Sequence, residues 1–362
     1  MTELEQARLL INSADEEMAR LFQQRMDAVR TVAEYKKTHG LPVDDLAREA
    51  QIISRNSAYI SDEDYRSYYV NFLRNTIDLS KQYQHRLLDG MRVAYSGVEG
   101  AFANIVAERI FPDAEYVGYS DFDAAYNAVV SGECDCALLP MENSYNGDVG
   151  KVLDLAFFGS LYINGVYEAE ITQNLLAVNG TQLGDIKTVI SHPQALGQCA
   201  SYIKKMGFET EEAVNTAVAA KIVAESGRND IAAIGSEEAA DKFGLIKLEG
   251  HINETSNNTT RFGVFSRVRR EPAVGDNRFI MLFTVKNVAG SLGRAVSVIG
   301  AHGFNLRALK SRPTKDSNWE YYFYAEGEGN ISSSEGKSML AYLETVCSNL
   351  KILASYEKEY KV

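Results

Sequence analysis

Three stretches of the sequence place hydrogen-bonding side chains next to an apolar run, and each could form part of a binding site. The first is NNTTRFGVF, residues 257–265, in which amides, hydroxyls and an arginine precede a strand-like run. The other two are LPMENS, residues 139–144, and SHPQAL, residues 191–196. A polar loop before a sheet would explain any one of them. Polar groups that follow the strands of an α/β sheet also gather where ligands bind, so both interpretations stay open on these residues alone.

The residue types in these stretches suit hydrogen bonding to a ligand better than nucleophilic or metal chemistry. No Ser-His-Asp arrangement and no zinc-type spacing of Cys and His stands out in the sequence. The stretch YSGVEGAF, residues 95–102, predicts a strand end and a helix start but lacks the GxGxxG of a dinucleotide site. Ser191 and Pro193 suit a helix cap and a first turn, which leaves Gln194 unexplained. We expect neither a metal nor a cofactor.

A second set of polar residues interrupts apolar helical stripes in the first 89 residues. Positions 4, 11, 18, 25 and 32 follow one another at intervals of seven, and Arg25 stands where a core residue belongs. Lys36 lies about 20° around the same helix from Arg25. Ser80 and Gln84 interrupt the stripe of the last helix. A buried network that fixes helix register would explain single residues, but cations together with amide and hydroxyl groups favour a pocket for a small dianion.

The elements that must position these residues fall into three zones. Residues 1–89 predict three helices, the first about 50 Å long. Its apolar seam at positions 4, 7, 11, 14, 18 and 21 needs partner helices, either from this chain or from a second subunit. Residues 90–268 alternate strand-like and helical runs, which predicts an α/β domain with mostly parallel strands. Residues 276–362 follow the β-α-β-β-α-β order of a ferredoxin-like α+β module.

Composition and charge exclude several classes of protein. A net charge of -12 argues against a nucleic-acid or membrane-surface partner, although an anionic small substrate can still bind a locally basic pocket. No apolar run approaches the roughly 20 residues of a membrane helix, and the beginning MTELEQARLL lacks a signal-peptide pattern. The four cysteines form no CxxC pair, and reduced thiols suggest the cytoplasm.

The first zone resembles the all-helical chorismate mutase family over about residues 4–89. The resemblance implies a pericyclic rearrangement of chorismate to prephenate, in a domain-entwined dimer where Arg8 reaches the partner's site. Arginines would hold the carboxylates, Lys36 and Gln84 would face the ether oxygen, and Glu49 and the backbone near Asp45 would hold the ring hydroxyl. The implied catalytic residues are Arg8, Arg25, Lys36, Asp45, Arg48, Glu49, Ser80 and Gln84.

The second zone resembles the prephenate dehydratase family over about residues 91–268, because LPMENS, SHPQAL and TTRF follow in the family's order. The resemblance implies two α/β lobes like those of a periplasmic solute-binding protein, with the site in the cleft. Thr260 is then the central catalytic residue, which holds the departing oxygen while Glu142 or a water supplies the proton. The implied substrate-binding residues are Asn143, Ser144, Ser191, Gln194, Thr216, Arg261 and Phe262.

Two details of this resemblance leave alternatives open. Arg261 would either hold a substrate carboxylate or form a structural ion pair. Ala101 and Ala103 stand near a place where the family often has a hydroxyl residue, so a contact there is open and a slower dehydratase is one outcome.

The third zone resembles the ACT domain, which in this enzyme family binds phenylalanine and inhibits the dehydratase. The implied regulatory residues are Gly290, Ser291, Leu292, Asn305, Leu306, Ser311 and Arg312. Lys310 replaces the Glu of the family's ESRP motif, which leaves the strength of inhibition open, and a purely structural dimerisation module is the alternative.

Together the three zones resemble the bifunctional chorismate mutase/prephenate dehydratase family of phenylalanine biosynthesis. The resemblance implies chorismate and prephenate as substrates, phenylalanine as effector and a homodimer. The alternative is an active chorismate mutase fused to a non-catalytic module that senses prephenate or phenylalanine.

Overall fold

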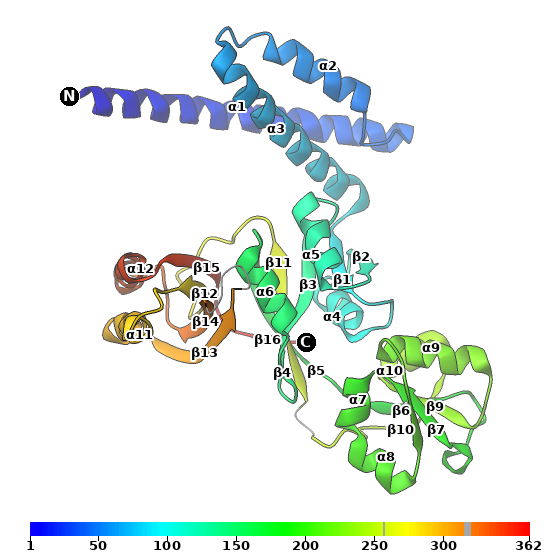
Figure 1. The fold of residues 1–362 in the computed structure, drawn as a ribbon. Coiled ribbons are helices and arrows are strands. Elements are labelled where there is room, and N and C mark those ends of the chain that lie inside the picture. Colours follow the sequence, from blue (N-terminus) through cyan, green and yellow to red (C-terminus); the bar gives the residue numbers. More distant parts are fainter. Residues whose placement is uncertain (256–257, 315–319) are drawn as a thin grey trace. The chain divides into compact units, whose positions relative to one another are not determined.

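The computed structural model describes residues 1–255, 258–314 and 320–362. Asn257, the first residue of the NNTTRF stretch, therefore lies outside the described residues. The chain divides into two compact units, Met1–Arg92 and Val93–Val362, which are described separately below (Figure 1). The division into domains at 1–89, 90–268 and 276–362 stays a prediction.

The first unit consists of three helices, as the apolar periodicity predicts. These are α1 (Glu3–His39), α2 (Leu46–Ser57) and α3 (Glu63–Asp89). With 37 residues, α1 is about 55 Å long. A capping box between Thr2 and Glu5 starts α1, and Gly40 in the left-handed conformation, with φ 62, ends it.

Only the second half of α1 packs against other helices of the unit. Ala33 on α1 and Leu73 and Ile77 on α3 form a small buried core. Every residue from 1 to 24 is exposed in one copy, including the predicted apolar seam. One copy of the unit therefore leaves a long apolar helix surface in water, which is a costly arrangement for a stable fold.

The second unit begins with two α/β lobes, each built on its own sheet (Figure 1). The sheet of the first lobe has the order β16-β5-β11-β3-β1-β2, with β4 beside β3. Its strands are β1 (Arg92–Ser96), β2 (Glu115–Tyr119), β3 (Cys136–Asn143), β4 (Gly147–Asp148), β5 (Tyr162–Glu170), β11 (Thr259–Ser266) and β16 (Tyr360–Lys361), and its helices are α4 (Phe102–Ile110), α5 (Phe122–Ser131) and α6 (Gly150–Phe158).

The second lobe is formed by one continuous segment, so the chain passes between the lobes twice, after β5 and before β11. Its sheet has the order β10-β6-β9-β7-β8. Its elements are β6 (Asn174–Ala177), η1 (Leu183–Asp185), β7 (Thr188–Ser191), α7 (Pro193–Gln198), α8 (Ala200–Met206), β8 (Glu209–Glu212), α9 (Thr216–Ser226), β9 (Ile231–Gly235), α10 (Glu237–Phe243) and β10 (Ile246–Glu249).

Both sheets are mixed, so the prediction of mostly parallel strands is wrong. Strand β3 is parallel to β1, and β7 is parallel to β8 and β9. Strand β11, however, returns from the second lobe and runs antiparallel to both of its neighbours, β3 and β5. In the second lobe β6 is antiparallel to β9. The double crossing between lobes reverses the direction in which the chain re-enters the first sheet.

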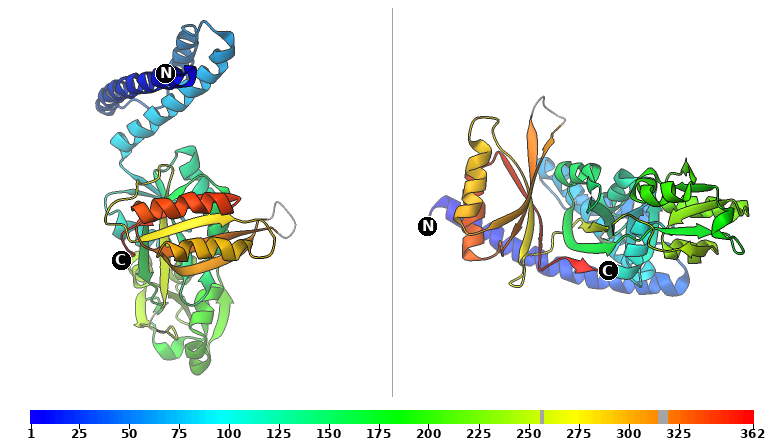
Figure 2. Two further views of the ribbon diagram at one scale, coloured as in Figure 1. Left: turned by 90° about the vertical axis from the view of Figure 1, so that its left-hand side faces the viewer. Right: turned by 90° about the horizontal axis from the view of Figure 1, so that it is seen from below.

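The C-terminal part forms an antiparallel four-stranded sheet with two helices, in the predicted β-α-β-β-α-β order. Its elements are β12 (Arg278–Thr284), α11 (Ser291–Ala301), β13 (Asn305–Pro313), β14 (Tyr321–Glu328), α12 (Ser334–Val346) and β15 (Asn349–Tyr356), and the sheet order is β13-β14-β12-β15. Figure 2 shows both helices on one face of this sheet. After β15 the chain adds β16 to the edge of the first lobe, parallel to β5, which the sequence pattern did not predict.

Alternation along β12 explains why both faces of the C-terminal sheet are buried. Phe279, Met281 and Phe283 pack in a core with residues of α11 and α12. The intervening Ile280 and Leu282 pack in a core shared with the first lobe.

None of the described helices has the apolar length that a membrane crossing requires.

Candidate active sites

A cleft of about 460 Å³ in the second unit is lined by residues of both lobes. Five of the predicted residues line it: Asn143, Gln194, Thr216, Thr260 and Phe262. Ala101 and Ala103 line it as well, with small apolar side chains. The three polar stretches from which the sequence analysis began therefore meet at one cavity.

The pairing of β3 with β11 explains how Asn143 and Thr260 come to face the same cleft. Asn143 is directly opposite Thr260 in the antiparallel register. The register shifts between Arg261 and Phe262, which leaves Met141 without a partner on β11. Because of this bulge on β3, the strict alternation of side chains is broken, and both Pro140 and Asn143 line the cleft.

Hydrogen bonds fix the orientation of the Asn143 amide and therefore the direction of the Thr260 hydroxyl. The Asn143 Oδ1 atom accepts from the backbone N–H groups of Tyr145 and Asn146, each at 3.0 Å. Its Nδ2 must then point the other way, where it donates to Thr260 Oγ1 at 3.0 Å and to Asn258 Oδ1 at 2.9 Å. Because Thr260 Oγ1 accepts the hydrogen bond from Asn143, the Thr260 hydroxyl can donate its own hydrogen to a ligand in the cleft.

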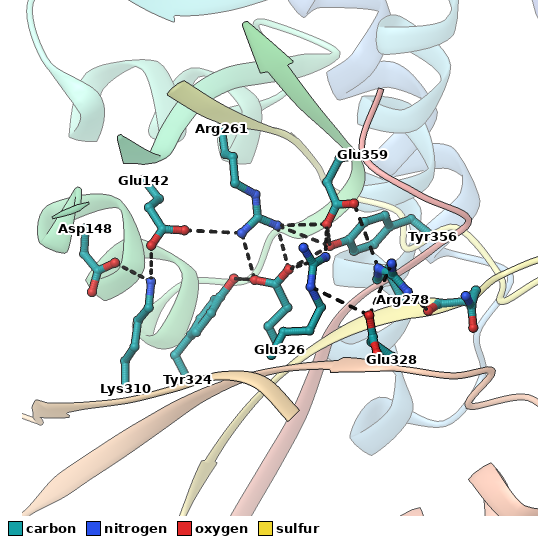
Figure 3. Close-up of polar contacts among 12 residues, drawn as sticks. Glu142, Asp148, Arg261, Arg278, Lys310, Tyr324, Glu326, Glu328, Tyr356 and Glu359 are labelled. Carbon is teal, nitrogen blue, oxygen red and sulfur yellow. Dashed lines mark hydrogen bonds and ion pairs between the residues drawn. The ribbon is translucent and has the colours of Figure 1, made fainter. Parts of the chain in front are cut away.

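Two predicted residues point to the opposite face of these strands and do not line the cleft. Glu142 forms ion pairs with Lys310, at 2.8 Å, and with Arg261, at 3.3 Å (Figure 3). Arg261 in turn is held by Glu326 of β14. The hypothesis that Glu142 supplies a proton in the cleft is therefore wrong. Of the two roles considered for Arg261, the structure supports the ion pair.

Two predicted serines are occupied by structural hydrogen bonds. Ser191 is fully buried and donates from Oγ to the carbonyl of Ile234 on the neighbouring strand β9, at 2.6 Å. The N-cap of α7 is His192, so the prediction that Ser191 caps this helix is wrong. Ser144 Oγ accepts from the backbone N–H of Thr259, at 2.9 Å, and ties β3 to β11 outside the cleft.

Several polar side chains that line the cleft were not predicted from the sequence. They are Ser96, Ser120, Gln173, His192, Gln198 and Asn215. His192 belongs to the SHPQAL stretch and could have been proposed from it, whereas Gln173 lies on a crossing between lobes and gives no sequence signal. Gln173 Oε1 is buried without a hydrogen-bond partner, as expected of an atom that contacts a ligand.

The protonation of His192 follows from its contacts. Its Nδ1 accepts from the N–H of Gln194 at 3.2 Å, so the neutral ring carries its hydrogen on Nε2. Burial lowers the pKa of His192, and Glu212 opposes this effect only in part. We conclude that the ring is a neutral donor beside the cleft.

The described lining of the cleft contains no Lys, Arg, Asp or Glu. Four helices begin there instead, since first-turn residues of α4, α5, α7 and α9 are among the lining residues. Free backbone N–H groups and the helix dipole favour anions at helix N-termini. The cleft is therefore suited to a carboxylate ligand without a cationic side chain.

In the first unit the predicted polar residues of α1 and α3 meet. Arg25 donates to the Ser80 hydroxyl and, at 3.3 Å, to the carbonyl of Thr76. Gln84 donates to the carbonyl of Ser80 at 3.3 Å, while its buried Oε1 has no partner. Lys36 donates to the carbonyl of Val43 at 2.7 Å. Burial lowers the pKa of Arg25, as expected for a cation that awaits an anionic partner.

Two of the predicted residues around α2, Asp45 and Glu49, already have partners within the protein. The Asp45 side chain caps α2 by accepting from the backbone N–H of Arg48 at 2.9 Å, and both residues are exposed. Glu49 forms an ion pair with Lys81 of α3 at 3.2 Å, which the sequence analysis missed. Arg8 is exposed in the first half of α1.

The residues predicted to bind an effector lie at both ends of α11. Gly290, with φ 80, precedes Ser291 and Leu292 at its start, whereas Asn305 and Leu306 begin β13 after its end. An 11-residue helix is about 16 Å long, so one copy does not bring the two groups together. Ser311 and Arg312 lie near the other end of β13.

Arg312 is not available for an effector in this structure. It forms two hydrogen bonds with Asp154 of α6, at 2.8 and 3.1 Å, and Asp154 also accepts from the Tyr322 hydroxyl. The prediction that Arg312 binds an effector is therefore corrected to a contact between the C-terminal sheet and the first lobe. Among the described residues, no group of His, Cys, Asp and Glu is arranged to hold a metal ion.

Comparison with known proteins covers both units. The chorismate mutase type II family model matches residues 7–85, and the prephenate dehydratase model matches residues 93–270. The bifunctional chorismate mutase/prephenate dehydratase of Aquifex aeolicus is 30% identical over 366 residues, which cover 99% of each chain. The chloroplastic arogenate dehydratase/prephenate dehydratase 2 of Arabidopsis thaliana is 34% identical over 279 residues, covering 74% of this chain and 72% of that protein.

A solved structure gives the same result for the second unit. The prephenate dehydratase of Arthrobacter aurescens, in complex with L-Phe, matches 74% of this chain and 90% of that chain. Its TM-score is 0.69 at 26% identity.

We expect the pKa of His192 to lie below the ordinary value of about 6.5. Between the lowered pKa and about 6.5 the unfolded chain binds more protons than the folded chain, so stability falls as the pH drops through this window. An NMR titration of labelled histidines measures the midpoint, with His192→Gln to assign the signal. A midpoint above about 6.5 would contradict the buried neutral ring.

Proposed function

The chain belongs to the family of bifunctional chorismate mutases/prephenate dehydratases, and from this premise we propose which residues act in each reaction. The enzyme rearranges chorismate to prephenate and converts prephenate to phenylpyruvate, as required for phenylalanine biosynthesis. We place the first reaction in the helical unit and the second in the cleft of the second unit. The observation that best supports the second placement is the Asn143–Thr260 hydrogen bond, which directs the threonine hydrogen into the cleft.

In the proposed dehydratase reaction, prephenate loses carbon dioxide and its ring hydroxyl as the ring becomes aromatic. The electrons of the breaking C–C bond enter the ring, and the C–O bond breaks with its electrons on oxygen. Thr260 donates a hydrogen bond to this departing oxygen, which stabilises the developing negative charge. A threonine hydroxyl is a poor acid, so the proton comes from water, the second of the two sources considered. The helix N-termini hold the substrate carboxylates.

The alternative of a non-catalytic sensing module receives less support. Thr260, the residue that the family resemblance makes catalytic, is kept in the cleft lining, and the relatives that match the second unit are named as dehydratases.

Thr260→Val should lower kcat for phenylpyruvate formation by about 10²- to 10³-fold, the usual effect of removing one donor to a developing oxyanion. Thr260→Ser should keep most of the activity because it keeps the hydroxyl. The assay supplies chorismate and follows both prephenate and phenylpyruvate, and Thr259→Val serves as the control on the same strand. Wild-type protein that accumulates prephenate without phenylpyruvate would leave only the mutase function.

For the mutase we propose that Arg25, Lys36, Arg48, Ser80 and Gln84 bind chorismate, with Glu49 beside them. Their cations and donors match two carboxylates and an ether oxygen. Arg8 would come from a second copy, whose α1 would cover the exposed apolar seam of residues 1–24. A homodimer is therefore the proposed state, and we propose the cytoplasm as its location.

Lys36→Ala should lower mutase turnover by about three orders of magnitude, because it removes the cation proposed to face the ether oxygen. Lys37→Ala is the matched control, since Lys37 is exposed on the same turn. Circular dichroism checks that helix content is kept, and the dehydratase rate of the same chain is an internal control. Near-normal mutase turnover in Lys36→Ala would remove the assignment.

We further propose that the C-terminal module is an ACT domain that binds phenylalanine as an inhibitor. Gly290, Ser291, Leu292, Asn305, Leu306 and Ser311 are the proposed contacts. Because one copy separates them along α11, the proposed site is completed by a second copy.

Titration calorimetry with L-phenylalanine should give a saturable heat, and L-alanine should give none because it lacks the aromatic ring. The same L-phenylalanine concentrations should lower the rate of phenylpyruvate formation. A flat L-phenylalanine titration would remove the regulatory proposal and leave the dimerisation module as the alternative.

A further inference from the structure

We propose that Lys310 and Arg261 are positioning residues for the dehydratase: through them, the C-terminal sheet holds the two strands that present Asn143 and Thr260. The proposal rests on the dehydratase reaction proposed above. Neither residue touches the cleft, so their effect is exerted through β3 and β11.

Strands β3 and β11 present different residues on their two faces. Arg261 follows Thr260 on β11, Glu142 precedes Asn143 on β3, and the two charged residues are paired in register. Successive side chains of a strand point to opposite faces. The cleft face therefore presents Asn143 and Thr260, while the opposite face presents Glu142 and Arg261.

The C-terminal sheet binds both charged residues (Figure 3). Lys310 of β13 donates to Glu142 Oε1 at 2.8 Å and also to Asp148 of β4. Arg261 makes a two-pronged ion pair with Glu326 of β14, with Nη1–Oε2 at 2.9 Å and Nη2–Oε1 at 2.6 Å. Glu326 is 1% exposed, so this pair is shielded from water.

Neighbouring groups complete the cluster around Arg261. Glu359, which lies between β15 and β16, accepts from Arg261 at 3.3 Å. The hydroxyls of Tyr324 and Tyr356 donate to Glu326, at 3.4 and 3.3 Å. Buried bidentate pairs of this kind fix the orientation of both side chains as well as pairing their charges. The Arg261–Glu326 pair therefore restrains the backbone of β11 at Thr260 from the face opposite the cleft.

The position of Lys310 is sensitive because it separates two carboxylates. Glu142 and Asp148 are opposite each other in the β3–β4 register. Without a cation between them they would repel each other, beside the bulge at Met141 where the ladder is already interrupted. A shift of about 1 Å in Asn143 or Thr260 is enough to lower a rate by about 100-fold.

The test compares Lys310→Arg, Lys310→Met and Lys310→Glu in the full chain. We expect the kcat for phenylpyruvate formation to stay within about threefold of wild type for Arg, and to fall at least tenfold for Glu, with Met between them. The KM for prephenate should change less than threefold, because the helix N-termini proposed to hold the substrate carboxylates do not lie on β3 or β11. Glu142→Gln added to Lys310→Met should recover activity, since removing both partners of a pair costs less than removing one.

Two controls separate positioning from general damage. The mutase rate of the same chain should be unchanged in every variant, because its residues lie in the other compact unit. Lys351→Met removes another lysine of the C-terminal sheet, which donates to the carbonyls of Ala156 and Gly159 at the end of α6 and does not contact Glu142 or Asp148 among the described residues. This variant should keep the dehydratase kcat.

Hydrogen–deuterium exchange provides a readout that does not depend on turnover. Lys310→Glu should speed exchange in peptides from residues 136–143 and 259–266, and Lys310→Arg should not. If the wild-type chain forms no phenylpyruvate, the proposed function fails. The exchange rates of the Lys310 variants then test by themselves whether Lys310 holds β3 and β11 in place. Unchanged kcat and exchange in Lys310→Glu would overturn the proposal, as would a loss in Lys310→Met that Glu142→Gln fails to recover.

Discussion

The two-residue alternation of the antiparallel pair β3 and β11 is the constraint on which the second unit depends. One face of the pair presents Asn143 and Thr260 to the cleft, and the other presents Glu142 and Arg261 to the C-terminal sheet. A charged residue on the cleft face would add a fixed charge to a lining that has none in the described residues. The same alternation on β12 buries both faces of the C-terminal sheet. Because of strand alternation, residues next to each other in the sequence have different roles: one contacts the ligand cleft and its neighbour packs against the C-terminal sheet.

Much of the architecture could be predicted from the sequence, because it rests on local periodicity. The long first helix follows from apolar spacing, and the β-α-β-β-α-β order follows from alternating runs. The antiparallel return of β11 could not be predicted, since nothing in residues 259–266 says which strands will lie beside them. For the site, the polar residue types identified Thr260 and Asn143 as candidates, but they did not show which residues of each strand face the cleft. The sequence therefore predicted Glu142 in the cleft and left Arg261 open, whereas alternation next to Asn143 and Thr260 turns both to the opposite face.

The polar residues of the helical unit depend on contacts beyond a single copy of the chain. The polar cluster of this unit is partly assembled within one copy, where hydrogen bonds link Arg25 to Ser80 and Gln84 to the carbonyl of Ser80. Residues 1–24 of α1 are exposed in that copy, and the buried Gln84 Oε1, which has no hydrogen-bond partner among the described residues, indicates a missing polar group. The apolar spacing predicts that the seam must be covered, but spacing cannot distinguish a helix of the same chain from one of another copy. The arrangement of the site is thus tied to assembly as well as to folding.

The place of β11 between β3 and β5 has a consequence for synthesis. The second lobe uses only strands from residues 174–249 and can complete its sheet as soon as they have left the ribosome. The first lobe cannot, because β3 and β5 share no direct pairing and wait for residues 259–266 to join them. Until then each strand has an open edge on its β11 side, and unpaired edges favour aggregation. The later-translated lobe is therefore the first whose sheet can close, and the earlier lobe completes its sheet only after it.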